Sequence, residues 1–328
     1  MENYLYGSAR VRVLENNLIG REKIERLLAA GNTDRCADLL AEFGVAVERD
    51  ESGKFLREET LLGVLRAAYR EVAESTENAA FMRVFRWQYD CNNIKAAIKC
   101  AKRGVDPAGM LFDFGNFSAR TAVTCVEKND FSALEEPFAS AAKEATEAFA
   151  KTGNPQWVDL VLDRACYAAM QRDAGTSAFL LDLVRAKIDL TNTLTCVRLL
   201  RMRSGEAGKL MLRDAVIGGG TLDAAFFEDG YDRGEDALWD EIRRTGLERF
   251  ALMAGGSAAT LTAVERAGDD FLMGKVRVAR MIPYGVEILA AYLFAVETEV
   301  RNLRVVLAGI AAGLPAKTVG ERIRESYV

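Results

Sequence analysis

The pattern of apolar positions in the last third of the chain predicts one long helix. After Pro283, apolar residues recur with spacings of three and four that alternate as in a heptad repeat. These positions are Val286, Leu289, Leu293, Val296, Val300, Leu303, Leu307 and Ile310. Gly313 is the expected stop, because glycine readily takes the left-handed conformation that follows many helices. We therefore expect a helix with one narrow apolar stripe that faces a neighbouring helix throughout.

Two earlier segments repeat this helix and its polar residues. Each copy has an acid and an asparagine three residues apart, followed by a glycine 11 or 13 residues after the asparagine. The copies are Asp90, Asn93 and Gly104; Asp189, Asn192 and Gly205; and Glu299, Asn302 and Gly313. When the asparagines are aligned, most apolar positions of the last helix are apolar in both earlier copies. The repeat predicts three related units at 1–120, 121–222 and 223–328, each with a long helix, a tight turn and a short helix.

The repeated acid and asparagine allow two interpretations. Residues three apart lie on one face of a helix, next to the apolar stripe. They can form a polar site for a ligand or partner at three equivalent positions. Alternatively, they form a partly buried hydrogen-bond network that fixes how each long helix meets its neighbours, since an amide both donates and accepts. We favour the network.

The rest of the chain also reads as helix. Segments rich in Ala, Leu, Glu, Arg and Lys alternate with short breaks at Gly, Pro and Asn, and no long alternating run suggests a strand. We therefore predict an all-α fold. The longest uncharged stretch near the C-terminus, 305–316, has 12 residues, whereas a membrane-spanning helix needs about 20. We expect no direct insertion into the bilayer.

Composition removes several classes of chemistry. The chain has 328 residues and no histidine, which excludes Ser-His-Asp catalysis and His-ligated zinc. Its net charge of −5 argues against nucleic-acid binding. The six cysteines show no C-x-x-C spacing, which favours reduced, mostly buried thiols in a cytoplasmic protein.

Four short sequence features lack the residues that a functional site would need. No Gly-Lys pair follows a glycine by the five residues of a P-loop, and 218–220 reads as a hinge or tight turn. The acidic segment 228–241 places Tyr231 and Arg233 where a calcium loop needs oxygen ligands. Asp269-Asp270 lacks the further acids of a magnesium site, so we interpret both acidic segments as solvated helix ends or partner surface. We predict no catalytic, cofactor-binding or metal-ligating residue and no cofactor.

Several separated segments resemble a known family. The stretches at 297–304, 313–315 and 322–328 resemble the end of the C subunit of prokaryotic V-type (A-type) rotary ATPases, whose eukaryotic homologue is the d subunit of the V-ATPase. The segments 4–15 and 265–272 fit the same family in the expected order. The resemblance therefore extends over residues 4–328.

The resemblance implies a fold and a function. The expected fold is three similar helical units around a pseudo-threefold axis, forming a funnel. The expected function is that of a non-catalytic central-stalk rotor component that couples the D and F subunits of the shaft to the membrane proteolipid ring. It would transmit torque for ion transport or ATP synthesis, as a peripheral protein at the cytoplasmic face.

Two alternatives remain open. One is a helical adaptor protein that binds other soluble proteins, and the other is an all-helical enzyme that acts on a diphosphate.

Overall fold

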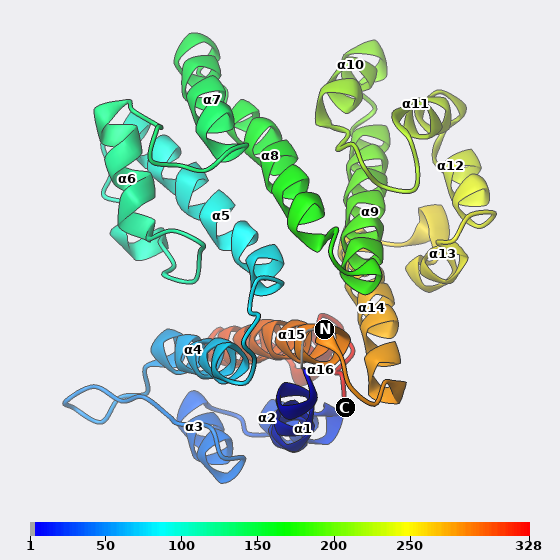
Figure 1. The fold of residues 1–328 in the computed structure, drawn as a ribbon. Helices are drawn as coiled ribbons and strands as arrows, with labels where there is room; N and C mark the ends of the chain where they lie inside the picture. The colour runs from blue at the N-terminus through cyan, green and yellow to red at the C-terminus, as the bar shows by residue number, and fades with distance from the viewer. Residues whose placement is uncertain (1–3) are drawn as a thin grey trace. The chain divides into compact units, whose positions relative to one another are not determined.

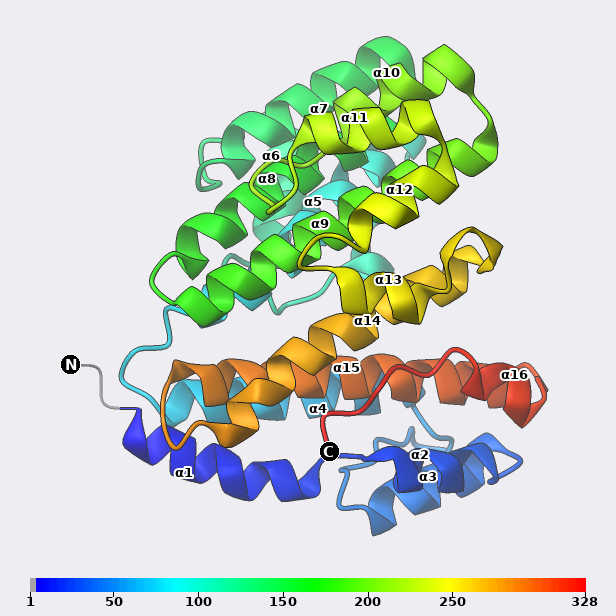
Figure 2. The same cartoon turned by 90° about the vertical axis from the view of Figure 1, so that its right-hand side faces the viewer.

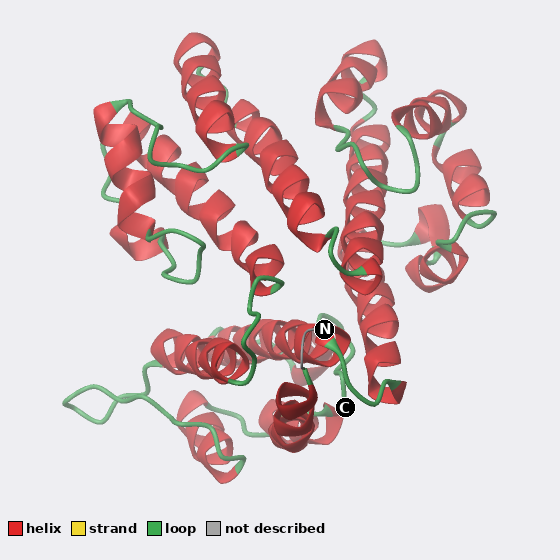
Figure 3. Cartoon of the chain, in the orientation of Figure 1, coloured by secondary structure: helices red, strands yellow, loops and turns green. Residues whose placement is uncertain are grey.

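The computed structural model describes residues 4–328, and most of these residues are in helices. Figure 3 shows helices joined by loops and turns. Within residues 4–328 the only β-type pairing is an isolated antiparallel bridge between Arg49 and Phe55. The all-α prediction is confirmed. All six cysteines are buried as free thiols.

The chain divides into two compact units. The first unit contains the residues up to Ala79 together with Ile242–Val328, and the second contains Ala80–Glu241. The chain thus leaves the first unit after Ala79 and returns to it after Glu241. The predicted division into 1–120, 121–222 and 223–328 is finer than these two units and stays a prediction.

The first unit is built around one central helix, α15 (Val286–Ala311). The other helices are α1 (Leu5–Leu14), α2 (Arg21–Leu28), α3 (Thr33–Glu42), α4 (Arg57–Glu74), α13 (Glu248–Ala254), α14 (Leu261–Val276) and α16 (Ala316–Gly320), with 3-10 turns η1 (Glu15–Asn17), η3 (Gly256–Ala258) and η4 (Arg277–Met281). In Figures 1 and 2, α15 lies beside α4 and above α1, and it also contacts α2, α3, α14 and α16.

The predicted long helix is confirmed, but its packing differs from the prediction. A single narrow stripe is wrong for α15, because Ile288, Ala291, Ala295 and Val306 lie off the stripe and are also buried. Helices surround α15 on several sides, so apolar residues outside the heptad positions are buried as well.

The second unit contains two further long helices, α5 (Met82–Arg103) and α9 (Ala178–Met202). Its other helices are α6 (Ala119–Lys128), α7 (Phe138–Thr152), α8 (Gln156–Ala174), α10 (Gly205–Ala215), α11 (Ala224–Arg233) and most of α12 (Glu235–Ile242), with the 3-10 turn η2 (Ala108–Met110). Helix α8 packs against α5, α7 and α9. Within residues 4–328, no helix has the length and apolar character needed to cross a membrane.

The long helices end in the same register, with one correction to the predicted turn residues. Gly104 and Gly313 have φ values of 64° and 68°, as left-handed residues after a helix should. The second helix ends eleven residues after Asn192 at Arg203, with φ 53°. Gly205 instead begins α10. The equivalent turn position therefore holds an arginine, and a sequence search for glycine passes over it.

The short helix predicted after each turn forms fully in two copies. It is α10 in the second copy and α16 in the third, whereas the first copy has only the 3-10 turn Ala108–Met110.

Candidate functional site

The three repeated asparagines make the same pair of hydrogen bonds. In each case the amide Nδ2 donates to the carbonyl oxygen of one later residue, and Oδ1 accepts from the N–H of that same residue. The pairs are Asn93 with Phe112 (2.8 and 2.9 Å), Asn192 with Ile217 (2.8 and 2.9 Å) and Asn302 with Arg324 (3.0 and 2.9 Å). Each amide thus satisfies both backbone groups of one loop residue against a buried helix face. We call these three places, with their acids, the first, second and third acid–amide sites.

In the first two sites the acid binds the same loop a little further along. Asp90 accepts from the backbone N–H of Asn116 at 2.8 Å and from that of Phe117 at 3.4 Å. Asp189 accepts from the backbone N–H groups of Thr221 and Leu222, each at 3.0 Å. The donors lie four and five residues after the asparagine-bound residue in both sites. The two loops therefore share one register although their lengths differ.

A glycine allows the loop to approach the carboxylate in both sites. A Cβ atom added at Gly115 would lie 1.9 Å from Oδ1 of Asp90, and one at Gly220 would lie 2.1 Å from Oδ1 of Asp189. Both glycines are three residues after the asparagine-bound residue. The last glycine of the run 218–220 is therefore the residue that lets the loop approach Asp189. The sequence suggested only a hinge or tight turn for this run.

The residue after the bound N–H pair starts a helix in both sites. Ser118 accepts from the N–H of Thr121 and begins α6, while Asp223 accepts from the N–H of Phe226 and begins α11. These side chains satisfy N–H groups that the first helical turn leaves unpaired. Each site therefore fixes the exit of its loop and the entry into the next helix.

The third site takes its acid-bound N–H from a distant part of the chain. Glu299 accepts from the backbone N–H of Ile19 at 2.6 Å. Glu325 directly follows the asparagine-bound Arg324, and its N–H donates to Asp270 at 2.7 Å instead of to Glu299. Ile19 directly precedes Gly20, the residue that caps α2. Helix α2 thus follows the acid-bound N–H in the third site, as α6 and α11 do in the other two.

Burial changes the acidity of two of these carboxyl groups. All six acid and asparagine side chains are buried. Loss of water raises the pKa of Asp90 to about 6, against the opposing effect of its backbone N–H donors and of Arg83. The same cause raises the pKa of Glu299 to about 7, against the N–H of Ile19 and the charge of Lys23. Glu299 accepts one backbone hydrogen bond, from Ile19, whereas Asp90 accepts from Asn116 and Phe117.

Six of the nine predicted repeat positions, the acids and asparagines, form the three acid–amide sites, two in the second unit and one in the first. The glycines lie outside these sites: Gly104 and Gly313 at the turns and Gly205 at the start of α10. Sequence reasoning missed the partner segments, including Phe112, Gly115, Ile217 and Gly220. The spacing from asparagine to partner varies between the copies, so alignment on the asparagines alone leaves the partners out of register.

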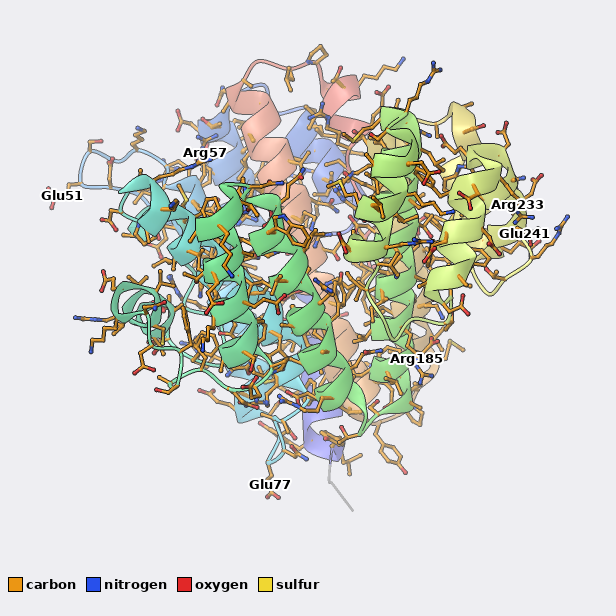
Figure 4. The ribbon with its side chains drawn as sticks, turned by 90° about the horizontal axis from the view of Figure 1, so that it is seen from above. Glu51, Arg57, Glu77, Arg185, Arg233 and Glu241 are labelled. Atoms are coloured by element: carbon orange, nitrogen blue, oxygen red, sulfur yellow. The ribbon has the colours of Figure 1, made fainter. Side chains whose placement is uncertain are left out.

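The two acidic segments make internal contacts. Figure 4 shows Arg233 at the end of α11 beside Glu241 of α12, and this ion pair measures 3.4 Å. Other acids of 228–241 pair with α9 and α10: Glu228 with Arg213, Asp232 with Lys209 and Glu235 with Arg201. These pairs tie α11 and α12 to the preceding helices.

The Asp269-Asp270 pair holds the last segment of the chain. Asp269 binds Arg324 at 3.0 Å and Arg301 at 3.1 Å. Asp270 is buried and accepts from the N–H of Glu325, so its interpretation as a solvated residue is wrong. Among residues 4–328, no cluster of three or more acids or cysteines is arranged to hold a metal ion.

Comparison with known proteins identifies a family. The model of the ATP synthase (C/AC39) subunit family matches residues 8–322. The chain is 23% identical to the C subunit of the V-type sodium ATPase of Enterococcus hirae, over 97% of each protein. It is 24% identical to the C subunit of the A-type ATP synthase of Halorubrum lacusprofundi, over 96% of this chain and 95% of the relative. It is 25% identical to the corresponding A-type ATP synthase protein of Haloferax volcanii, over 94% of each.

Proposed function

The chain belongs to the ATP synthase (C/AC39) subunit family, and we propose that it is the central-stalk rotor subunit of a V-type or A-type ATPase. The family is one of structural, non-catalytic subunits, and its members named above are the C subunits of such complexes. Membership in the family makes the chain a peripheral subunit that binds other subunits of the complex. The rotor role, the shaft and ring partners and the cytoplasmic face are our proposal.

The single observation that carries the proposal is the threefold recurrence of the acid–amide site. It supports three similar helical units, and we propose that they are arranged around a pseudo-threefold axis as a funnel. The predicted units at 1–120, 121–222 and 223–328 are part of this proposal. The third acid–amide site also takes in the residues around Ile19, because the N–H of Ile19 donates to Glu299.

Stiffness of the three long helices is the physical property that the rotor role requires. A part that transmits torque needs elements that do not bend, and broad interfaces in place of a nucleophile. The three long helices have 22, 25 and 26 residues, and each is bonded through its asparagine to the loop that follows it. Buried and fully paired polar groups resist rearrangement, since breaking them leaves unsatisfied groups in a dry interior.

We propose that the segments after the three turns, 107–117, 206–217 and 315–325, face the proteolipid ring, with the D and F subunits at the opposite mouth. Each turn region exposes a large apolar side chain: Met110, Leu210 and Leu314. An exposed apolar side chain within or next to each segment suits a contact with another protein.

Affinity purification of the tagged full chain from detergent-solubilised membranes tests the rotor role. We expect D, F and proteolipid subunits to co-elute, and cross-links from the three segments to reach the proteolipid. Absence of these subunits would refute the rotor role and favour a helical adaptor. Cross-links from all three segments to D or F alone would reverse the orientation.

A further inference from the structure

Two of the six buried cysteines lie opposite each other on neighbouring helices of the second unit. Helix α8 packs against α5 (Figure 1). Ion pairs join Lys99 to Asp159, Lys95 to Asp163 and Arg83 to Asp173, at 2.6, 2.6 and 2.9 Å. Residue numbers fall along α5 as they rise along α8, so the two helices are antiparallel. In this register Cys91 of α5 lies opposite the turn of α8 that contains Cys166.

Contacts of the Cys91 side chain bring the two thiol groups together. Sγ of Cys91 donates to the carbonyl oxygen of Leu162 at 3.5 Å. In an α-helix that oxygen also accepts the backbone N–H four residues later, which here is the N–H of Cys166. The thiol of Cys91 lies within hydrogen-bonding reach of the thiol of Cys166. The two side chains are 2% and 5% exposed, so the sulfur atoms meet inside a dry helix interface.

A lysine and an aspartate border the thiol of Cys91. Oδ1 of Asp163 accepts from Nζ of Lys95 at 2.6 Å and lies 3.9 Å from Sγ of Cys91. The contact with Cys166 and burial raise the pKa of the Cys91 thiol, while the positive charge of Lys95 opposes this shift. The ammonium group therefore favours the thiolate, which is the reactive form of cysteine, and the carboxylate is placed to take up the thiol proton.

We propose that Cys91 and Cys166 form a reversible disulfide between α5 and α8 when the protein meets a peroxide. The thiolate of Cys166, the more exposed of the two, attacks one oxygen of hydrogen peroxide. An S–O bond forms, the O–O bond breaks, and the departing hydroxide takes up the proton that this thiol released.

The second step joins the two sulfur atoms. The thiolate of Cys91 attacks the sulfenic sulfur of Cys166, so that an S–S bond forms and the S–O bond breaks. The hydroxide that leaves takes up the Cys91 proton by way of Asp163. Two thiols and one hydrogen peroxide thus give one disulfide and two water molecules. The sulfur atoms lose two electrons, and the peroxide gains them. Thiol reductants reverse the bond, as is typical of redox-sensing disulfides in reducing compartments.

Two other buried cysteines serve as comparison thiols within the same chain. Cys36 donates to the carbonyl oxygen of Leu27, and Cys196 donates to that of Phe227, each at 3.7 Å. Burial raises the pKa of Cys36 to about 11 and that of Cys196 to about 12. They share the burial of the proposed pair but contact a carbonyl oxygen of their own surroundings, so they report oxidation that depends on burial alone.

Peptide mapping after peroxide treatment tests the proposal in the folded full chain. Hydrogen peroxide is added, free thiols are blocked by alkylation, and tryptic peptides are compared with and without reduction. Trypsin releases Cys91 in 87–95 and Cys166 in 165–172, with one cysteine in each peptide. We expect these two peptides to be linked at least about tenfold more than any pair with a comparison thiol, and dithiothreitol to separate them. Absence of the linked pair, or equal linkage of the comparison thiols, would overturn the proposal.

Three variants test the two chemical steps. Cys91→Ser removes the second thiol, so dimedone, which labels sulfenic acids, should label Cys166. Lys95→Met should slow disulfide formation about tenfold, because loss of the ammonium group disfavours the thiolate. Lys99→Met is the matched control, since it removes an ion pair between the same helices one turn further along α5, and it should leave the rate unchanged. Lack of dimedone on Cys166, or equal rates for the two lysine variants, would contradict the mechanism.

Discussion

The second unit and the first unit build the same acid–amide site from different stretches of chain. In the second unit, one continuous loop supplies the asparagine-bound residue, the close glycine, the N–H donors and the helix cap within seven residues. In the first unit, Arg324 supplies the asparagine-bound backbone and Ile19 the acid-bound N–H. The hydrogen bonds are alike, but the third site needs segments 305 residues apart in the sequence to meet. Closing so long a loop costs more chain entropy than closing a local one.

The comparison also shows which features the site geometry requires. The asparagine suits all three sites because an amide carries its donor and its acceptor on separate atoms and can bond the C=O and N–H of one backbone residue together. The close glycine occurs only where the same loop passes directly over the carboxylate, at Gly115 and Gly220. In the third site the acid-bound N–H comes from another part of the chain. A Cβ atom added at Gly20 would meet only Val328, at ordinary contact distance.

The largest effect is expected from loss of an asparagine. Asn192→Ala leaves the N–H and carbonyl of Ile217 buried without partners, which should lower the free energy of unfolding by about 2–6 kcal/mol. Asn93→Ala and Asn302→Ala should cost less, since their partner groups are only partly buried. Urea unfolding measures all three. Asn16→Ala, at an exposed position, is the control, and an equally large loss there would contradict the role of the amides.

The third site should make stability depend on pH in a window set by Glu299. Its pKa is raised from 4.5 to about 7 in the folded protein. The folded state therefore binds the proton of Glu299 more tightly than the unfolded state does. The stability that this adds is fully present below pH 4.5 and is lost as the pH rises through 7. The loss amounts to roughly 3 kcal/mol at most.

Glu299→Gln should remove this loss while it keeps an oxygen that accepts from Ile19. Urea unfolding at several pH values, compared between the variant and the original protein, gives the difference. Asp90→Asn is the matched change in the first site, and its window should end lower, near pH 6. A difference between Glu299→Gln and the original protein that does not vary from pH 4.5 to 8 would contradict the buried carboxyl group.

Glycine-to-alanine substitutions should affect stability differently in the second and third sites. Gly220→Ala places a methyl group on Oδ1 of Asp189, and overpacking of this kind costs about 1–3 kcal/mol. Gly20→Ala, where the nearest atom is 3.4 Å away, should change stability little. Thermal unfolding of the two variants tests this, and equal destabilisation would show that the loop moves aside.

The smallest effect is expected at the helix ends. Arg203→Gly should stabilise the protein by about 1 kcal/mol, because it relieves the left-handed conformation of an L-residue. Gly104→Ala should destabilise by a similar amount at the equivalent turn of the first copy. Opposite signs in thermal unfolding support the shared register, whereas the same sign at both positions would contradict it.

Part of this structure could be predicted from the sequence because helix formation is local. The heptad spacing after Pro283, together with Gly313, predicts α15 and its end. The acid and asparagine three residues apart predict a shared helix face. The partners of those side chains could not be predicted, since the loops to Phe112, Ile217 and Arg324 differ in length.

The sequence by itself determined the all-helical class and the positions of the three long helices with their buried acid and asparagine. These follow from hydrogen bonds four residues apart and from apolar periodicity, which act within a few turns. Only the tertiary structure decided that Ile19 completes the third site and that Gly220 lies against Asp189. These features depend on which distant segments meet, and that is settled by packing and chain closure over the whole unit.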